Sequence, residues 1–228
     1  MEFKYKLEML PWLIGMLVVT SCVHEAGHAW IAWRSGDRSD YIATRKNPFS
    51  FRHVSWLFTL LVPIVMLLSV GFMLGGARPV QVRMAVGPGR MALVALAGPI
   101  GNFMVAAMAL VGLAGAVHLG WVDPWISGFG TPTPYFYGLY AVAFSVFLGL
   151  LNLIPVPPLD GSRVVAAAMP ESWRDFYYRT LTIPGIILLL VVFLGMAFLY
   201  PEELGAVTMK VIGRLDLWCR AIQEWLEA

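Results

Sequence analysis

The stretch TSCVHEAGHAWIAW, residues 20–33, places two histidines and a glutamate inside a segment that is otherwise apolar enough to cross a membrane. An ionisable side chain inside a bilayer is costly and usually marks a functional site. His24 and His28 are four residues apart, so on a helix they project from one face, one turn apart. This spacing lets both imidazoles bind one zinc ion, and Glu25 can act as a general base toward a water molecule there. The pattern therefore predicts a zinc-dependent hydrolytic site within a membrane.

The amino-acid composition is that of a membrane protein. Of the 228 residues, 59% are hydrophobic and 13% are charged, whereas a soluble domain carries about 25% charged residues. A helix needs about 20 predominantly apolar residues to cross a bilayer, so the apolar runs allow about four to six transmembrane or re-entrant helices. We therefore expect an all-α polytopic membrane protein. The apolar runs are 9–33, 54–77, 91–117, 124–159 and 180–201.

Two polar segments beside the apolar runs have the composition of short strands. Residues 41–51 carry the pieces YIAT and FSF on either side of an Asn47-Pro48 turn, and residues 78–82 are also strand-like. We expect these segments to form a small β-hairpin element near the active site. Such an element would hold a substrate segment extended by pairing with its edge.

Residues 201–228 follow the last apolar run and show a helical pattern. Their apolar residues recur at three- and four-residue spacing, which is typical of an amphipathic helix. We expect a single membrane domain over residues 1–200, followed by this helix lying on the membrane surface. The alternative is a helix-pairing contact that makes a homo-oligomer. The apolar residues of this pattern are Leu204, Val207, Val211, Leu215, Trp218, Ile222 and Trp225.

The charge of the chain argues against a nucleic-acid partner. The formal net charge is +2, and the lysines and arginines are spread over loops instead of forming one basic face. We therefore expect the lipid bilayer to be the environment of the protein and expect no nucleic acid to bind.

Two histidines leave a catalytic zinc ion one protein ligand short of the usual three. The third ligand should be a His, Asp or Glu that lies near a membrane boundary at the same depth. Asp160 has the strongest context, because three prolines in NLIPVPPLDGSR stiffen an extended approach before Gly161 turns the chain. Irregular backbone at membrane depth occurs only where protein or water forms hydrogen bonds with its N–H and C=O groups. A metal ligand held in a fixed position is such a place. The other candidates are His53, His118 and Asp123.

Three motifs together resemble a known family. HEAGH in the first apolar run, AGPIGN at 97–102 and NLIPVPPLDG at 152–161 are similar to the signature motifs of the site-2 protease family of intramembrane zinc metalloproteases, and they occur in the family's order. The pieces RKNPFSFRH, LLVPIVM and GGARPVQV resemble the compact branch of that family, which lacks PDZ and CBS domains. The resemblance covers residues 10–195 or so.

The resemblance implies a role for each matching residue. It places one zinc ion per chain on His24, His28 and Asp160, with Glu25 as the residue that activates the water. Asn102 and Asn152 stand at the family's asparagine positions and would bind the substrate backbone or stabilise the oxyanion. The alternative for either asparagine is a hydrogen bond that joins two helices.

The chain departs from the family pattern at one place. Members of the compact branch often carry His-x-Asp after the Asn-Pro segment, whereas this chain has His53-Val54-Ser55. The resemblance therefore does not extend to a role of this pair in structure or as an extra metal contact. We expect His53 to be interfacial rather than a metal ligand.

The depth of the site constrains the topology. A shared zinc ion needs the C-terminal half of the first helix and Asp160 on one side of the membrane, but three full crossings between them would put them on opposite sides. We expect 54–77 to be the exception, because Pro63 and the closing Gly75-Gly76 allow a broken helix that enters and returns. Eleven of the 16 lysines and arginines then lie on the catalytic side, which the positive-inside rule makes cytoplasmic.

These observations predict an intramembrane zinc metalloprotease that hydrolyses peptide bonds within or next to transmembrane segments of a substrate protein. We expect it to be a multi-pass protein of a prokaryotic cell membrane. The alternative from another class is a membrane ion or proton pathway, or a transporter, that uses the buried His, Glu and Asp. It does not explain the four-residue histidine spacing, and the sequence has no visible inverted repeat. A protease-derived scaffold without activity is disfavoured because Glu25 and all three proposed ligands are present.

Overall fold

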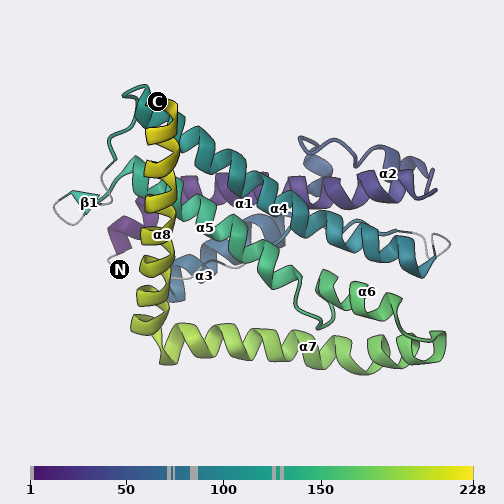
Figure 1. The fold of residues 1–228 in the computed structure, drawn as a ribbon. Helices are drawn as coiled ribbons and strands as arrows, with labels where there is room; N and C mark the ends of the chain where they lie inside the picture. The colour runs from purple at the N-terminus through teal and green to yellow at the C-terminus, as the bar shows by residue number, and fades with distance from the viewer. Residues whose placement is uncertain are drawn as a thin grey trace.

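Four long apolar helices form the body of the protein. The computed structural model describes residues 3–70, 73, 75–82, 87–124, 127–128 and 131–227. In this part of the chain the helices that are long and apolar enough to cross a bilayer are α1 (Phe3–Arg34), α4 (Pro88–His118), α5 (Pro134–Asn152) and α7 (Glu171–Leu199). Figure 1 shows that α1, α4 and α5 lie beside one another and that the axis of α7 has roughly the same orientation as that of α1. The prediction of an all-α protein is confirmed.

Helices α1 and α4 pack closely because small residues face each other. A Cβ atom at Gly27 of α1 would lie 2.7 Å from the carbonyl oxygen of Ala97 in α4. A Cβ atom at Gly101 of α4 would lie 3.3 Å from the carbonyl oxygen of Val23 in α1. Small residues let membrane helices approach until their backbones touch. This contact fixes α4 against the half of α1 that carries the two histidines.

The apolar segment that begins at residue 54 enters the body and returns. It consists of a π-helical stretch, η2 (Trp56–Leu61), followed by α3 (Val62–Val70), and residues 75–82 then return without helix or strand. At the end of the return the N–H of Arg78 donates to the carbonyl oxygen of His53, at 2.7 Å. Both ends of the segment therefore lie at the same place, as the re-entrant arrangement requires, and α1 and Asp160 can share one side.

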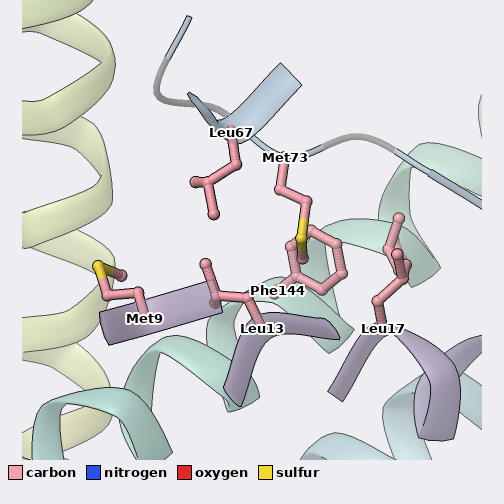
Figure 2. Packing of buried hydrophobic residues seen from close by; sticks show 7 residues of the cluster. Met9, Leu13, Leu17, Leu67, Met73 and Phe144 are labelled. Atoms are coloured by element: carbon pink, nitrogen blue, oxygen red, sulfur yellow. The ribbon is translucent and has the colours of Figure 1, made fainter. Parts of the chain in front are cut away.

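The returning segment is held by apolar packing as well as by hydrogen bonds. Leu67 of α3 and Met73 on the return are both buried against Leu13 and Leu17 of α1 and Phe144 of α5 (Figure 2). Inside a bilayer such contacts stabilise through van der Waals packing, because lipid is as apolar as these side chains. The cluster therefore fixes the re-entrant segment between α1 and α5.

The β-hairpin expected near the active site is wrong. Within residues 41–51 the chain instead forms a short helix, α2 (Asp40–Ala43), and then the 3-10 helix η1 (Phe51–His53). Ser39 stabilises the first of these, because its side chain accepts a hydrogen bond from the N–H of Ile42. Residues 78–82 are extended but pair with no strand. In the described part of the chain, strand pairing occurs only between β1 (Ser127–Gly128) and β2 (Thr131–Pro132), in the connection from α4 to α5.

The two remaining helices lie at opposite ends of the body. The short helix α6 (Asp160–Ala167) begins at the proposed third ligand, near the C-terminal end of α5. Helix α8 (Pro201–Glu227) lies across the other helices in Figure 1. Its residues Ile212 and Cys219 are buried against Tyr135 and Leu139 of α5. The apolar residues predicted to form one face therefore divide, since Val207, Val211, Trp218 and Trp225 are exposed.

The contact between α1 and α4 predicts that replacing two glycines of α1 by alanine changes the stability of the protein differently. Gly27→Ala places a methyl group against the backbone carbonyl of Ala97, which cannot move as a side chain can, and should lower the stability by about 1–3 kcal/mol. Gly15→Ala is the matched control, because nothing lies within 4 Å of a Cβ atom there. It should be neutral or stabilising by up to about 1 kcal/mol. The measurement is thermal unfolding of both variants in detergent; equal melting temperatures would contradict the packing described.

Candidate metal centre

Three side chains from two helices converge inside the body. His24 and His28 extend from α1, and their Nε2 atoms are 3.0 Å apart. Asp160, at the start of α6, places its Oδ2 atom 3.0 Å from Nε2 of His24 and 3.1 Å from Nε2 of His28. All three residues are buried. The structure thus brings together the two histidines and the aspartate that the sequence selects.

The protonation of both histidines follows from their second hydrogen bonds. Nδ1 of His28 lies 2.6 Å from the carbonyl oxygen of Val94, which can only accept, so this nitrogen carries the proton. The amide of Asn102 satisfies its surroundings in one orientation, donating to the carbonyl of Thr20 and accepting from the N–H of Gly149. In that orientation its oxygen accepts from Nδ1 of His24 at 3.2 Å. Each imidazole therefore has its Nδ1 held by an acceptor and its Nε2 directed at the centre.

The centre has the properties of a cation site. Two imidazole nitrogens and a carboxylate oxygen face one another, and Oδ2 of Asp160 has no hydrogen-bond partner. A metal ion between the three atoms would bind all of them. Two imidazoles and a carboxylate are a common ligand set of catalytic zinc, with zinc-to-ligand distances of about 2 Å. The residues present therefore fit a zinc ion.

The AGPIGN motif of α4 makes room for this centre. A Cβ atom at Gly98 would lie 2.5 Å from Nε2 of both His24 and His28, so any larger residue would displace the imidazoles. Asn102, one turn further, holds His24 through the hydrogen bond described above. The glycine of the motif thus leaves room for the two imidazoles, and the asparagine orients His24.

Asp160 is fixed by the loop that precedes it and by its own helix. The residue after it, Gly161, is so close to the carbonyl group of Leu153 at the end of α5 that a Cβ atom there would overlap it. Nη1 of Arg163 lies 3.8 Å from the second carboxylate oxygen, Oδ1. The remaining oxygen, Oδ2, points to the histidines.

Glu25 lies beside the three converging atoms. One of its carboxylate oxygens lies within 4.8 Å of the histidine donor atoms, and its Oε2 accepts a hydrogen bond of 2.7 Å from the backbone N–H of Val80. Glu25 also faces a cavity of about 240 Å³ that lies between α1 and α5 on one side and α7 on the other. A carboxylate in this position can exchange protons with a molecule in the cavity. The cavity is lined by His24, Glu25, Ala77, Asn102, Asn152 and Phe193, among others.

The other sequence candidates do not join the centre. His53 is fully buried and its Nε2–H donates to the carbonyl oxygen of Asn47 at 3.2 Å; burial lowers the pKa of this ring, so it stays neutral. His118 is the last residue of α4, about 30 Å along the helix from Gly98, and Asp123 follows the end of that helix. Asn152 lines the cavity and donates to the carbonyl of Leu148 at 2.9 Å.

Two contacts at the site could not be found from the sequence. The carbonyl of Val94 and the N–H of Val80 are backbone groups, so the identity of the residue carries no signal for them. The requirement for a small residue at Gly98 is different, because the AGPIGN motif marks it.

Comparison with known proteins agrees with the geometry. The model of peptidase family M50 matches residues 130–194. A protein of Bacillus subtilis named as a candidate zinc metalloprotease, YwhC, is 30% identical over 203 residues, which are 86% of this chain and 88% of that protein. Another so named, Rip2 of Mycolicibacterium smegmatis, is 35% identical over 173 residues, 74% of this chain and 60% of that protein. No solved structure matches the chain.

The matches confirm the resemblance seen in the three motifs. The relative from Bacillus subtilis is similar over 88% of its own length. The family model covers α5, α6 and most of α7. The chain belongs to peptidase family M50, the site-2 protease family.

Proposed function

We propose that this protein is an intramembrane zinc metalloprotease that hydrolyses peptide bonds within or next to transmembrane segments of a substrate protein. One zinc ion per chain is held by His24, His28 and Asp160. The observation that carries the proposal is the meeting of two imidazole nitrogens and a carboxylate oxygen, 3.0–3.1 Å apart, inside an apolar bundle. Family membership and the names of the relatives support the same activity.

Glu25 is the proposed general base and acid. A bound zinc ion polarises the scissile carbonyl and lowers the pKa of a water molecule at the site. Glu25 takes a proton from this water as its oxygen attacks the carbonyl carbon. It then gives the proton to the leaving nitrogen as the C–N bond breaks. The position of Glu25 between the histidines and the cavity supports this role.

The two asparagines have different surroundings, which favour different roles. Asn102 is buried, and its hydrogen bonds to Thr20, His24 and Gly149 support a role in orienting His24. Asn152 is only partly buried and lines the cavity. We propose that Asn152 donates to the substrate backbone or to the developing oxyanion, where one donor contributes about 3 kcal/mol. Its variant Asn152→Ala belongs in the cleavage assay below, and an unchanged kcat would remove this role.

The substrate must unwind before it can be cut. The hydrogen bonds of a helix hide its carbonyls, and inside a bilayer each freed backbone group needs a new partner. The cavity offers polar groups on one side and apolar residues of α5 and α7 on the other. These surroundings suit a short extended segment of a transmembrane substrate. The proposal involves no pairing with a β-hairpin, because residues 41–51 form no strand but the end of a short helix, turns and the start of a 3-10 helix.

Glu25→Gln tests the proposed chemistry directly. Glutamine has nearly the same shape but cannot take up a proton, so cleavage should fall by about 100-fold or more while zinc is retained. The assay uses protein in liposomes and a panel of synthetic single-span peptides, each interrupted by a central Gly-Pro pair, with products identified by mass spectrometry. Glu224→Gln, on the exposed surface of α8, is the matched control. A Glu25→Gln variant as fast as the wild type would refute the proposal.

The topology completes the proposal. We propose a multi-pass protein in a prokaryotic cell membrane, with the active site toward the cytoplasm and α8 on the opposite membrane surface. The return of the chain from His53 to Arg78 supports it, because the C-terminal end of α1 and the start of α6 then lie on one side. The exposed Trp218 and Trp225 suit a membrane interface.

Reporter fusions test this orientation. Fusions after residue 78 and after residue 165 should both report the cytoplasm, and a fusion at the C-terminus should report the other side. The expected pattern follows from the excess of lysines and arginines on the catalytic side. Opposite signals from residues 78 and 165 would exclude the re-entrant arrangement, and an inverted pattern would exclude the cytoplasmic site.

A further inference from the structure

The backbone of the re-entrant segment contacts the proposed catalytic base. The N–H of Val80 donates to Oε2 of Glu25 at 2.7 Å, and both residues are buried. Among the described residues, no second hydrogen bond reaches the carboxylate of Glu25. The orientation of its carboxylate therefore depends on a group from residues 75–82, far away in the sequence.

Glu25 needs such a partner because of its place on the helix. Successive residues of an α-helix are turned by about 100°, so Glu25 does not share the face from which His24 and His28 project. Its side chain also has three rotatable bonds, and an unrestrained glutamate visits many rotamers. A hydrogen bond to one oxygen restricts these rotamers and leaves the other oxygen free to act in proton transfer.

The N–H of Val80 is itself held in place from both sides. The side chain of Val80 is 2% exposed and packs in a cluster with Ala29 and Ile42. The hydroxyl of Tyr41 in α2 donates to the carbonyl of Pro79 and accepts from the N–H of Gln81, each at 3.4 Å. Tyr41 thus bridges the two residues that flank Val80. The packing of the Val80 side chain and the two hydrogen bonds of Tyr41 therefore both hold the N–H that binds Glu25.

We infer that the backbone N–H of Val80, held by Tyr41, positions Glu25 for proton transfer. The inference rests on the proposed function of Glu25. It assigns a second task to the re-entrant segment, which lines the cavity at Ala77 and fixes the base three residues later. Val80 and Tyr41 are positioning residues, because neither needs to touch the substrate.

The contact is tested first without reference to activity, by hydrogen–deuterium exchange of the peptide that contains residues 79–81. Pro79 has no N–H, so within these three residues only Val80 and Gln81 exchange, and overlapping peptides separate them from their neighbours. Glu25→Ala should speed the exchange of Val80, whereas Glu224→Ala should not change it. Tyr41→Phe should speed the exchange of Gln81. Exchange of Val80 that is the same with and without the Glu25 carboxylate would overturn the inference.

The effect on catalysis is tested with the single-span peptide that the wild type cleaves fastest. Val80→Pro removes the N–H and should lower kcat by about 10–100-fold, with KM and zinc content unchanged. Val80→Ala keeps the N–H and trims the side chain, so it should lose at most a few-fold. Tyr41→Phe is the milder variant and should lower kcat alone, with Tyr200→Phe as its exposed control.

The outcomes separate this inference from the proposed function. Wild-type cleavage with an unchanged kcat in both Val80→Pro and Tyr41→Phe would overturn the positioning role and leave the protease activity standing. Equal losses in Val80→Pro and Val80→Ala, with lower zinc content, would show that packing is the cause and would also overturn it. A folded, zinc-loaded wild type that cleaves no peptide of the panel would contradict the proposed function and this role together.

Discussion

The structure depends on the meeting of three atoms that can bind a metal ion. Nε2 of His24, Nε2 of His28 and Oδ2 of Asp160 are 3.0–3.1 Å apart in a buried place. In an apolar bundle such a polar group needs partners, and a bound metal ion would supply one for all three atoms. The second hydrogen bonds of both imidazoles, to Val94 and Asn102, hold the rings in this orientation.

Other features of the fold follow from the need to bring these atoms together. Glycines at positions 27, 98 and 101 let α4 touch α1 and leave space for the imidazoles. The re-entrant segment returns the chain to the side from which it entered, so that α4 and α5 carry the chain across and back to Asp160. A full crossing at residues 54–77 would place the aspartate on the wrong side of the bundle.

Much of the site could be predicted from the sequence, because its chemistry is carried by side chains. The four-residue spacing of His24 and His28 and the proline-stiffened approach to Asp160 identify the converging residues. The parity of the crossings, together with Pro63, indicates that one apolar run must return. A charged or polar group in an apolar segment is a strong signal, since burying it without a partner is costly.

The expectations that were wrong or incomplete concern the local backbone conformation of residues 41–51 and the surroundings of the apolar residues of α8. YIAT and FSF contain β-forming residues, but β propensity depends strongly on context, and the caps provided by Ser39 and Ser50 favour helical turns there. The apolar residues of α8 divide between the contact with α5 and the exposed surface, and a spacing pattern does not separate these. The contact of Val80 with Glu25 uses an N–H that nearly every residue has.

The measurement that tests the central claim most directly is the zinc content of purified protein in detergent, because it requires no knowledge of the substrate. Wild-type protein should hold about one zinc ion per chain, His24→Ala should hold none, and Asp160→Asn should bind zinc weakly. His118→Ala, far from the centre, is the control and should keep the full amount. Folded wild type that binds neither zinc nor another divalent metal, or full zinc content in His24→Ala, would contradict the metal centre described here.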